Sequence, residues 1–239
     1  MTSPRTRVCP RRDTVVPPDH ESHEETLVQL TKHGHACVVL SDGDRRLVVD
    51  PGAYTADDAW HGASALLVTH QHPDHFLPDR VRAALDGDPA LEVWTNAAVA
   101  EQLAGAGPRV HVVGAGDAFT AAGFDVTVHG EWHAVIHPDV PRVRNVGFLV
   151  EERVFHPGDA LTVPEVAVPT LLLPAHAPWS KTSELIDYLR EVRADRALAV
   201  HDGLLNDTGL GLVAGLLGER GPGQPVPYAR LAPGESVEV

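Results

Sequence analysis

Short apolar runs separated by turn residues mark most of the chain from residue 27 onward. Runs of this length, rich in Val, Leu, Ala and Thr, are typical of strands. They predict strands at residues 27–31, 36–41, 46–50, 65–69, 91–95, 109–113, 118–121, 124–129, 146–151, 153–156, 170–173 and 197–200, and a short strand pair at the C-terminus.

Helical spacing of apolar residues appears in four further segments, at residues 78–85, 97–104, 180–192 and 210–217. The first has Pro78 in its first turn, where proline is favoured. The clearest amphipathic helix is 180–192, because Leu185, Ile186, Leu189 and Val192 fall on one face. We expect Ser180 to cap its N-terminus.

The strands come in runs with helices between them in each half of the chain, which predicts an α+β fold with two sheets packed face to face and covered by helices. Residues 1–25 mix Arg, Pro, Asp, His and Glu without apolar periodicity and are expected to form a flexible tail. Residues 26–239 contain no Gly- or Ser-rich linker, so we expect a single domain there.

A cluster of polar side chains directly follows the apolar run at residues 65–68. Within the sequence Thr69-His-Gln-His-Pro-Asp-His75, four residues are possible metal ligands: His70, His72, Asp74 and His75. Crowded imidazoles are costly to desolvate without partners, and a divalent metal supplies such partners. The alternative is an exposed His-rich turn, since the 239 residues include 15 His.

Three more possible ligands follow apolar runs later in the chain: His133, Asp159 and His201. Each also has an ordinary interpretation: a surface loop histidine, a turn or N-cap aspartate, and a histidine at the edge of the core. In combination with the first cluster, they favour several strand ends converging on one metal site.

The motif His70-x-His72-x-Asp74-His75, followed by His133, Asp159 and His201, resembles the metallo-β-lactamase superfamily in order and spacing. The resemblance extends over residues 27–239. It is closest to small metal-dependent hydrolases related to ascorbate-6-phosphate lactonase and to phospholipase-D-like members. Further support comes from the segments 33–37, 50–52, 156–159 and 173–176.

This resemblance implies a four-layer αββα sandwich with a binuclear metal site at one edge between the sheets. One metal would be held by His70, His72 and His133 and the other by Asp74, His75 and His201, with Asp159 bridging them. The ligand set without cysteine favours zinc first and manganese second. The diiron members of the superfamily typically carry a carboxylate at the position of His72, so redox chemistry is not expected.

The implied reaction is hydrolysis, in which a metal-bound hydroxide attacks a small ester, lactone or phosphoester. Asp74 is the expected catalytic residue, because it can orient the hydroxide and carry a proton to the leaving group. The sequence leaves two alternatives open: a metal-binding protein of the same fold that has lost catalysis, and a nuclease of the superfamily.

Other polar residues are expected around the metals. His35, Asp50 and His156 are candidates for supporting the ligands, and His176, Trp179 and Lys181 are candidates for contacting substrate. His137 remains an alternative to His133 as the ligand after the strand at 124–129.

Composition narrows the choice of partners. The formal net charge is −14, from 33 acidic and 19 basic residues, which argues against nucleic acid as a partner and leaves a small molecule. Cys9 and Cys37 are too few for a disulfide framework. There is no apolar stretch of the ~20 residues that a membrane span needs, and the N-terminus carries no recognisable signal. We therefore expect a cytoplasmic protein.

Overall fold

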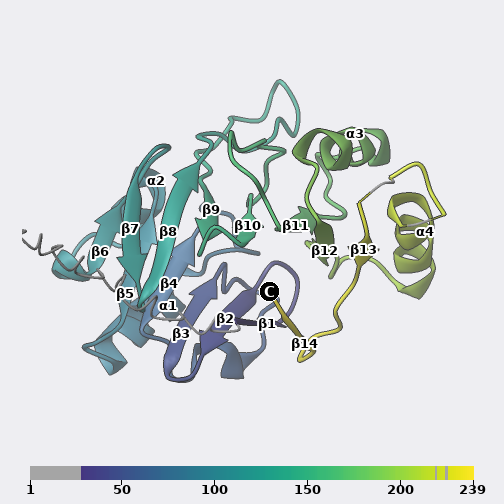
Figure 1. The fold of residues 1–239 in the computed structure, drawn as a ribbon. Helices are drawn as coiled ribbons and strands as arrows, with labels where there is room; N and C mark the ends of the chain where they lie inside the picture. The colour runs from purple at the N-terminus through teal and green to yellow at the C-terminus, as the bar shows by residue number, and fades with distance from the viewer. Residues whose placement is uncertain (1–27, 219, 224–225) are drawn as a thin grey trace, which may run out of the picture.

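The computed structural model describes residues 28–218, 220–223 and 226–239. The flexible tail expected at residues 1–25 lies outside this part of the chain. Within it, two seven-stranded sheets pack face to face, with helices on their outer sides (Figure 1). This confirms the predicted αββα sandwich.

The first sheet has the order β14-β1-β2-β3-β4-β5-β6. Its central strands β3, β4, β5 and β6 are parallel, and β1, β2 and β14 are added by antiparallel pairing. The bounds are β1 Gln29–Lys32, β2 Val38–Asp42, β3 Arg45–Val49, β4 Ala65–Val68, β5 Glu92–Thr95, β6 Val110–Val112 and β14 Ser236–Glu238.

The second sheet has the order β13-β12-β11-β10-β9-β8-β7. Strands β10 to β13 are parallel, whereas β7, β8, β9 and β10 form an antiparallel meander. The bounds are β7 Ala118–Ala121, β8 Phe124–His129, β9 Gly147–Val150, β10 Val154–His156, β11 Thr170–Pro174, β12 Arg196–Val200 and β13 Tyr228–Ala229.

Four α-helices and two short 3-10 helices complete the described part of the chain. Each sheet carries two of the α-helices, and in Figure 1 α3 and α4 lie together beside β11, β12 and β13. The bounds are η1 Asp57–Trp60, α1 Pro78–Gly87, α2 Ala97–Gln102, η2 Gly107–Arg109, α3 Thr182–Val192 and α4 Asp207–Leu217. The 3-10 helices were not among the predicted elements.

Strand periodicity explains the layers. In β4, Ala65 and Leu67 point into the core between the sheets, whereas Leu66 and Val68 face the core beneath α1 and α2. A strand buried on both faces has no polar side, which is why β4 is a continuous apolar run. Leu172 of β11 similarly lies between the sheets, and its neighbours Leu171 and Leu173 pack under α3 and α4.

The predicted C-terminal strand pair is wrong. β13 joins the second sheet beside β12, and β14 pairs with β1 in the first sheet. Val237 of β14 packs against the core between the sheets, and burial there outweighs a local hairpin between the two short strands. The C-terminal segment thus connects the two sheets.

A buried ionic group makes a second connection. Lys32, at the end of β1, is 1% exposed, and its Nζ lies 2.5 Å from Oδ1 of Asp202, which follows β12. Arg230 donates to the other oxygen of Asp202 at 2.6 Å. Because Asp202 is the neighbour of His201, these contacts hold the end of β12 against β1.

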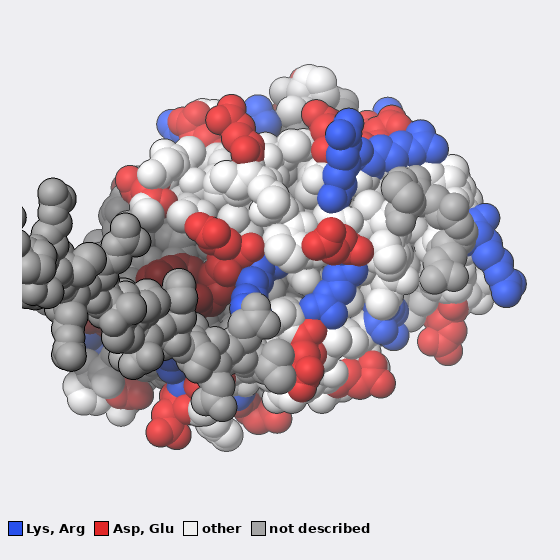
Figure 2. Space-filling model, in the orientation of Figure 1, with Lys and Arg blue, Asp and Glu red and all other residues white. Residues whose placement is uncertain are grey.

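Acidic and basic side chains are interspersed on the face drawn in Figure 2. No helix among the described residues is long and apolar enough to cross a membrane.

Candidate metal centre

The polar cluster forms where strands of both sheets end. β8 is antiparallel to β9 and β9 to β10, so β8 runs in the same direction as β10, β11 and β12. Side chains that follow these strands therefore emerge at one edge, as ligands do at the carboxyl ends of parallel strands. β4 of the first sheet brings the His70–His75 turn to the same edge.

All seven side chains that the sequence predicts as ligands lie in this cluster. Their potential ligand atoms form overlapping groups, within each of which the atoms lie no more than 4.8 Å apart. We call His70, His72, His133 and Asp159 the first set, and Asp74, His75, His201 and Asp159 the second set. Asp159 belongs to both because its carboxylate lies between the imidazoles of the two.

Hydrogen bonds fix the ring orientations in the first set. Nδ1 of His70 lies 3.0 Å from the hydroxyl oxygen of Thr69, and Nδ1 of His133 lies 2.6 Å from the carbonyl oxygen of Ala134. Each Nδ1 therefore carries the proton and donates it, which leaves Nε2 with a free lone pair. Nε2 of His70 lies 3.1 Å from Nδ1 of His72.

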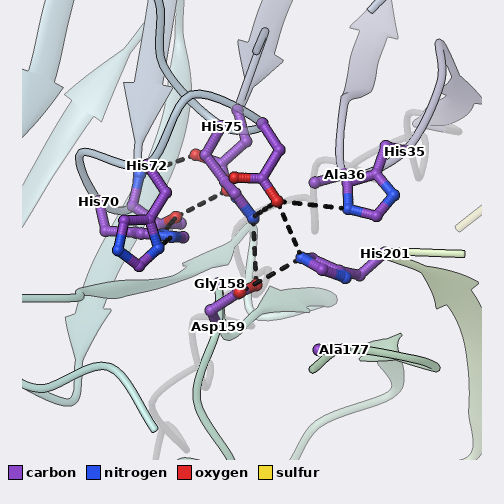
Figure 3. A network of polar contacts seen from close by, with 12 residues as sticks. His35, Ala36, His70, His72, His75, Gly158, Asp159, Ala177 and His201 are labelled. Carbon is purple, nitrogen blue, oxygen red and sulfur yellow. Dashed lines mark hydrogen bonds and ion pairs between the residues drawn. The ribbon is translucent and has the colours of Figure 1, made fainter. Parts of the chain in front are cut away.

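The second set is oriented in the same way. Nδ1 of His75 donates to Oδ2 of Asp50 at 2.7 Å, and Nδ1 of His201 donates to the carbonyl oxygen of His176 at 2.6 Å. Both rings then direct Nε2 at Asp159 (Figure 3), and Nε2 of His75 lies 3.1 Å from its Oδ1. Nε2 of His201 lies 3.2 Å from Oδ2 of Asp159 and 3.3 Å from Oδ2 of Asp74.

These contacts fit metal binding. Nε2 of His35, His75, His133 and His201 and Oδ1 of Asp159 are buried without a hydrogen-bond partner. Buried polar atoms normally have partners, so five orphaned atoms in one place need an explanation. Lone pairs of nitrogen and oxygen facing each other at 3.1–3.3 Å are favourable only with a cation or a proton between them. Neutral imidazole and carboxylate are the ligands that zinc and related divalent ions take.

Electrostatics differ between the two sets. Burial holds the pKa of His70 well below its usual value, and that of His72 is also lowered, so both rings are neutral. Burial also disfavours charge on His201, but the adjacent carboxylates of Asp159 and Asp74 raise its pKa to about 9. Asp159 and Asp50 likewise overcome burial and raise the pKa of His75 well above its usual value. As free side chains, the second set therefore holds protons that a cation would displace.

Asp50 is the main support of the cluster. Its side chain is fully buried, and its carboxylate accepts from the backbone N–H of Thr69 at 2.8 Å, the hydroxyl of Thr69 at 2.7 Å and the ring of His75. The loop after Asp50 also contacts the cluster, because a Cβ on Gly52 would lie 2.0 Å from the backbone of Asp74. Only glycine allows this approach.

His35 and His156 support the site differently. Nδ1 of His35 accepts from the backbone N–H of Gly203 at 3.0 Å, so its proton lies on Nε2, which is 3.5 Å from Oδ2 of Asp74. Nδ1 of His156 accepts from the N–H of Gly158 at 3.1 Å. Its Nε2 donates to the carbonyl of Ala36 at 3.0 Å and lies 3.8 Å from Oδ2 of Asp50.

Sequence reasoning missed Thr69 and Asn145 as supporting residues. Asn145 is fully buried; its oxygen accepts from the N–H of Asp159 at 3.0 Å and its amide donates to the carbonyl of Pro157 at 2.8 Å. It thereby holds the turn that carries Asp159. A lone asparagine before β9 gives no sequence signal of this role, whereas Thr69 stands next to the first ligand.

The loop before α3 contacts the cluster through two of the three residues that are expected to contact substrate. The indole N–H of Trp179 donates to Oδ2 of Asp159 at 2.8 Å, and His176 contributes its carbonyl oxygen to His201. Lys181 is 80% exposed and pairs with Glu184. The expected N-cap at Ser180 is wrong: α3 begins at Thr182 with Lys181 as N-cap, and the hydroxyl of Ser180 bonds to the backbone of Ala177 instead.

The two histidines near His133 lie outside the cluster. The side chain of His137 is 63% exposed and lies beside Asp139, whereas His133 is 1% exposed. His129 pairs with the hydroxyl of Thr127 at 3.0 Å.

Comparison with known proteins agrees with this architecture. A family model described as "Beta-lactamase superfamily domain" matches residues 29–201. Protein Rv0786c of Mycobacterium tuberculosis is 40% identical over 198 residues, which cover 80% of this chain and 92% of that protein. The UPF0173 metal-dependent hydrolase TTHA1283 of Thermus thermophilus is 30% identical over 146 residues, 56% of this chain and 62% of the relative.

A solved structure shows the same fold. The metallo-β-lactamase fold protein YhfI from Bacillus subtilis superposes with a TM-score of 0.66 at 14% identity, over 90% of this chain and all of that chain. The match of the family model over most of the chain, together with the sandwich and its polar edge, identifies the chain as a member of the metallo-β-lactamase superfamily.

Proposed function

We propose that the protein is a binuclear metal-dependent hydrolase that acts on a small ester, lactone or phosphoester. The observation that carries the proposal is the set of buried, unpartnered Nε2 atoms around the carboxylate of Asp159, each on a ring whose Nδ1 is already engaged. The first set would hold one divalent ion and the second set the other, with Asp159 shared. Zinc suits these nitrogen and oxygen ligands best, and manganese next.

The chemistry that divalent ions supply in such a site is a water whose pKa falls from 15.7 to about 7, and a polarised carbonyl or phosphoryl oxygen on the substrate. The protein's own part is to hold the ligands rigidly. Asp50, Thr69 and Asn145 do so from buried positions.

Asp74 has the position of the proton-handling group. Its side chain is 24% exposed, whereas those of His75 and His201 are almost fully buried. Despite burial, the adjacent rings of His201 and His35 lower the pKa of Asp74, so it is a carboxylate that accepts a proton from the attacking water and passes it to the leaving group. The ring of His35 places Nε2 3.5 Å from Oδ2 of this carboxylate.

The names of relatives support hydrolysis. Three of the matched proteins, from Thermus thermophilus and Xanthobacter autotrophicus, are named metal-dependent hydrolases. The chain covers 62% to 68% of their length. Metal-dependent hydrolysis by this protein is therefore a proposal that their names support.

The proposal is tested by metal analysis of the purified protein combined with a panel of lactones, carboxylic esters, thioesters and phosphodiesters. We expect two equivalents of divalent metal and turnover of at least one class. His133→Ala should reduce turnover by more than about 100-fold, above the effect typical of outer-shell partners. His137→Ala is the matched control, because it removes an exposed histidine from the same loop.

The remaining outcomes separate the alternatives. Full metal content without turnover of any substrate would support a binding protein that has lost catalysis, and cleavage of RNA or DNA would support a nuclease. Asp159→Asn should weaken both metal sites together, since its carboxylate contacts rings of both sets. Loss of only one equivalent would mean that Asp159 does not bridge.

A further inference from the structure

A pocket of about 370 Å³ lies directly beside the first set. This volume falls in the ~300–1,000 Å³ range of small-molecule sites. Its walls are the chain neighbours of two cluster residues: Trp132 and Ala134 flank His133, and Ala160 and Leu161 follow Asp159. The pocket therefore adjoins the two chain segments that carry His133 and Asp159, although neither of those side chains lines it.

Trp179 belongs to both the pocket and the cluster. It lines the pocket, and its indole N–H donates to Oδ2 of Asp159 at 2.8 Å. Its ring lies edge-on to that of His133, with 5.9 Å between centroids. The backbone N–H of Ala134 also donates to the carbonyl of Asp159, at 2.8 Å. The pocket wall and the cluster are thus one rigid unit.

A second tryptophan, Trp132, also lines the pocket and is held in place although it is 37% exposed. The guanidinium of Arg144 lies 3.8 Å from the centroid of the Trp132 ring, and the two residues form an isolated antiparallel bridge. Arg144 is in turn paired with Glu131. An aromatic ring fixed this way at a surface offers a flat apolar face at low entropic cost.

The charge in the pocket is unbalanced. Arg142 donates from Nε to the carbonyl of His133 at 2.5 Å, and within the described residues no carboxylate lies within 4.0 Å of its guanidinium. Glu184 is the other charged lining residue, and it is engaged by Lys181 through the backbone N–H at 3.1 Å and Nζ at 3.7 Å. The guanidinium carbon of Arg142 also lies 5.8 Å from the centroid of the Trp132 ring. A guanidinium without a carboxylate partner is suited to bind a carboxylate.

We propose that this pocket binds the non-reacting part of the substrate: a flat apolar ring that contacts Trp132 and Trp179 and carries a carboxylate facing Arg142. The proposal rests on the proposed hydrolase function, and it narrows the substrate to an ester or lactone of an anionic aromatic compound. Such a molecule places its scissile bond at the cluster when its ring fills the pocket.

The kinetic test uses 6-acetoxy-2-naphthoate and its neutral analogue 2-naphthyl acetate. The metal-loaded protein should prefer the carboxylate. Arg142→Gln should lower the ratio of the two kcat/KM values about tenfold, the worth of one charge-assisted hydrogen bond. Arg190→Gln is the matched control, because it removes the same charge from a 52% exposed position on α3 outside the pocket and should leave the ratio unchanged. An unchanged ratio in Arg142→Gln would overturn the assignment.

A binding measurement separates this proposal from the proposed function. Titration with 6-hydroxy-2-naphthoate, followed by calorimetry, needs no turnover. We expect Trp132→Ala and Arg142→Gln each to weaken binding about tenfold, and Val166→Ala, at a 51% exposed apolar position outside the pocket, to leave it unchanged. If binding depends on both residues but no ester, lactone or phosphoester is hydrolysed, the pocket assignment holds and the hydrolase proposal is refuted. If simple esters are hydrolysed but neither substitution changes the affinity for 6-hydroxy-2-naphthoate, the hydrolase proposal holds and the pocket assignment is refuted.

Discussion

Each buried imidazole in the second set has one nitrogen held by a protein acceptor and the other aimed at a carboxylate. For His75 the acceptor is Asp50, a residue in the left-handed backbone region, with φ of 51°. Asparagine tolerates that conformation better than most residues, so Asp50→Asn changes charge and hydrogen bonding with little effect on the backbone.

We therefore expect Asp50→Asn to weaken metal binding by about 10–100-fold, as loss of an outer-shell carboxylate does. Competition with a chromogenic chelator measures the change. Asp44→Asn, in the exposed turn between β2 and β3, is the control for the loss of one negative charge. Equal affinities of the two variants would show that Asp50 does not orient a ligand.

Proton release is the second expectation at this scale. The pKa of His201 is raised to about 9, so its ring is protonated in the metal-free protein at pH 7.5 and must lose that proton to bind a metal. Metal affinity should therefore increase as pH rises toward about 9 and decrease below that value. Calorimetry in buffers of different ionisation enthalpy counts the released protons. If no protons are released at pH 7.5, the rings of the second set are neutral beforehand.

At the scale of elements, the turn after β10 places Asp159 through close packing. Gly158 has φ of 63°, and a Cβ there would lie 2.3 Å from Oδ1 of Asn145 and 2.7 Å from Cβ of Thr69. Both neighbours are buried supporting residues of the site, so the turn cannot move aside without disturbing the ligands.

Gly158→Ala should therefore lower both the free energy of unfolding and the metal affinity. Gly43→Ala is a matched control, because Gly43 has φ of 56° with no atom within 4 Å of its added Cβ. The control should cost only the backbone strain, about 1–2 kcal/mol. Denaturant unfolding and metal titration of both variants separate strain from packing. A Gly158→Ala protein that matches the control in both measurements would contradict this account.

The element boundaries show what local sequence encodes. The predicted strands at 118–121 and 124–129 match β7 and β8 residue for residue, since tight turns with glycine delimit them. Other strands differ by one or two residues at an end, where fraying and pairing decide the boundary. The N-cap of α3 was misplaced because Ser180 uses its hydroxyl within the preceding turn.

At the scale of the whole molecule, the proposed ligands come from both sheets: β4 of one, and β8, β10 and β12 of the other. A bound metal would therefore cross-link the two halves of the sandwich, as the Lys32–Asp202 pair and strand β14 also do. Binding only to the folded state stabilises it, by about 2.7 kcal/mol at a free metal concentration 100 times Kd.

We expect zinc to raise the Tm and a chelator to lower it, with one cooperative transition in both cases. Differential scanning calorimetry of the protein with zinc, with manganese and after chelation makes the comparison, and magnesium is the control for ionic strength. If zinc, manganese and chelation all leave the Tm unchanged, the cluster does not bind metal in the folded state.

The sequence by itself determined the class of fold and the residues of the polar cluster. Buried strands must be apolar, and ligands that follow apolar runs are visible as His and Asp at strand ends, so pattern and residue type sufficed. The spacing of His70, His72, Asp74 and His75 also indicated metal before any geometry was known.

The tertiary structure alone decided what depends on contacts between residues far apart in the chain. It placed His133 in the cluster and His137 outside it, divided the C-terminal strands between the sheets, and gave Asn145 a supporting role. It also placed Trp179 against Asp159 and beside a pocket. Such contacts form only when the two sheets pack against each other, so local sequence propensity does not predict them.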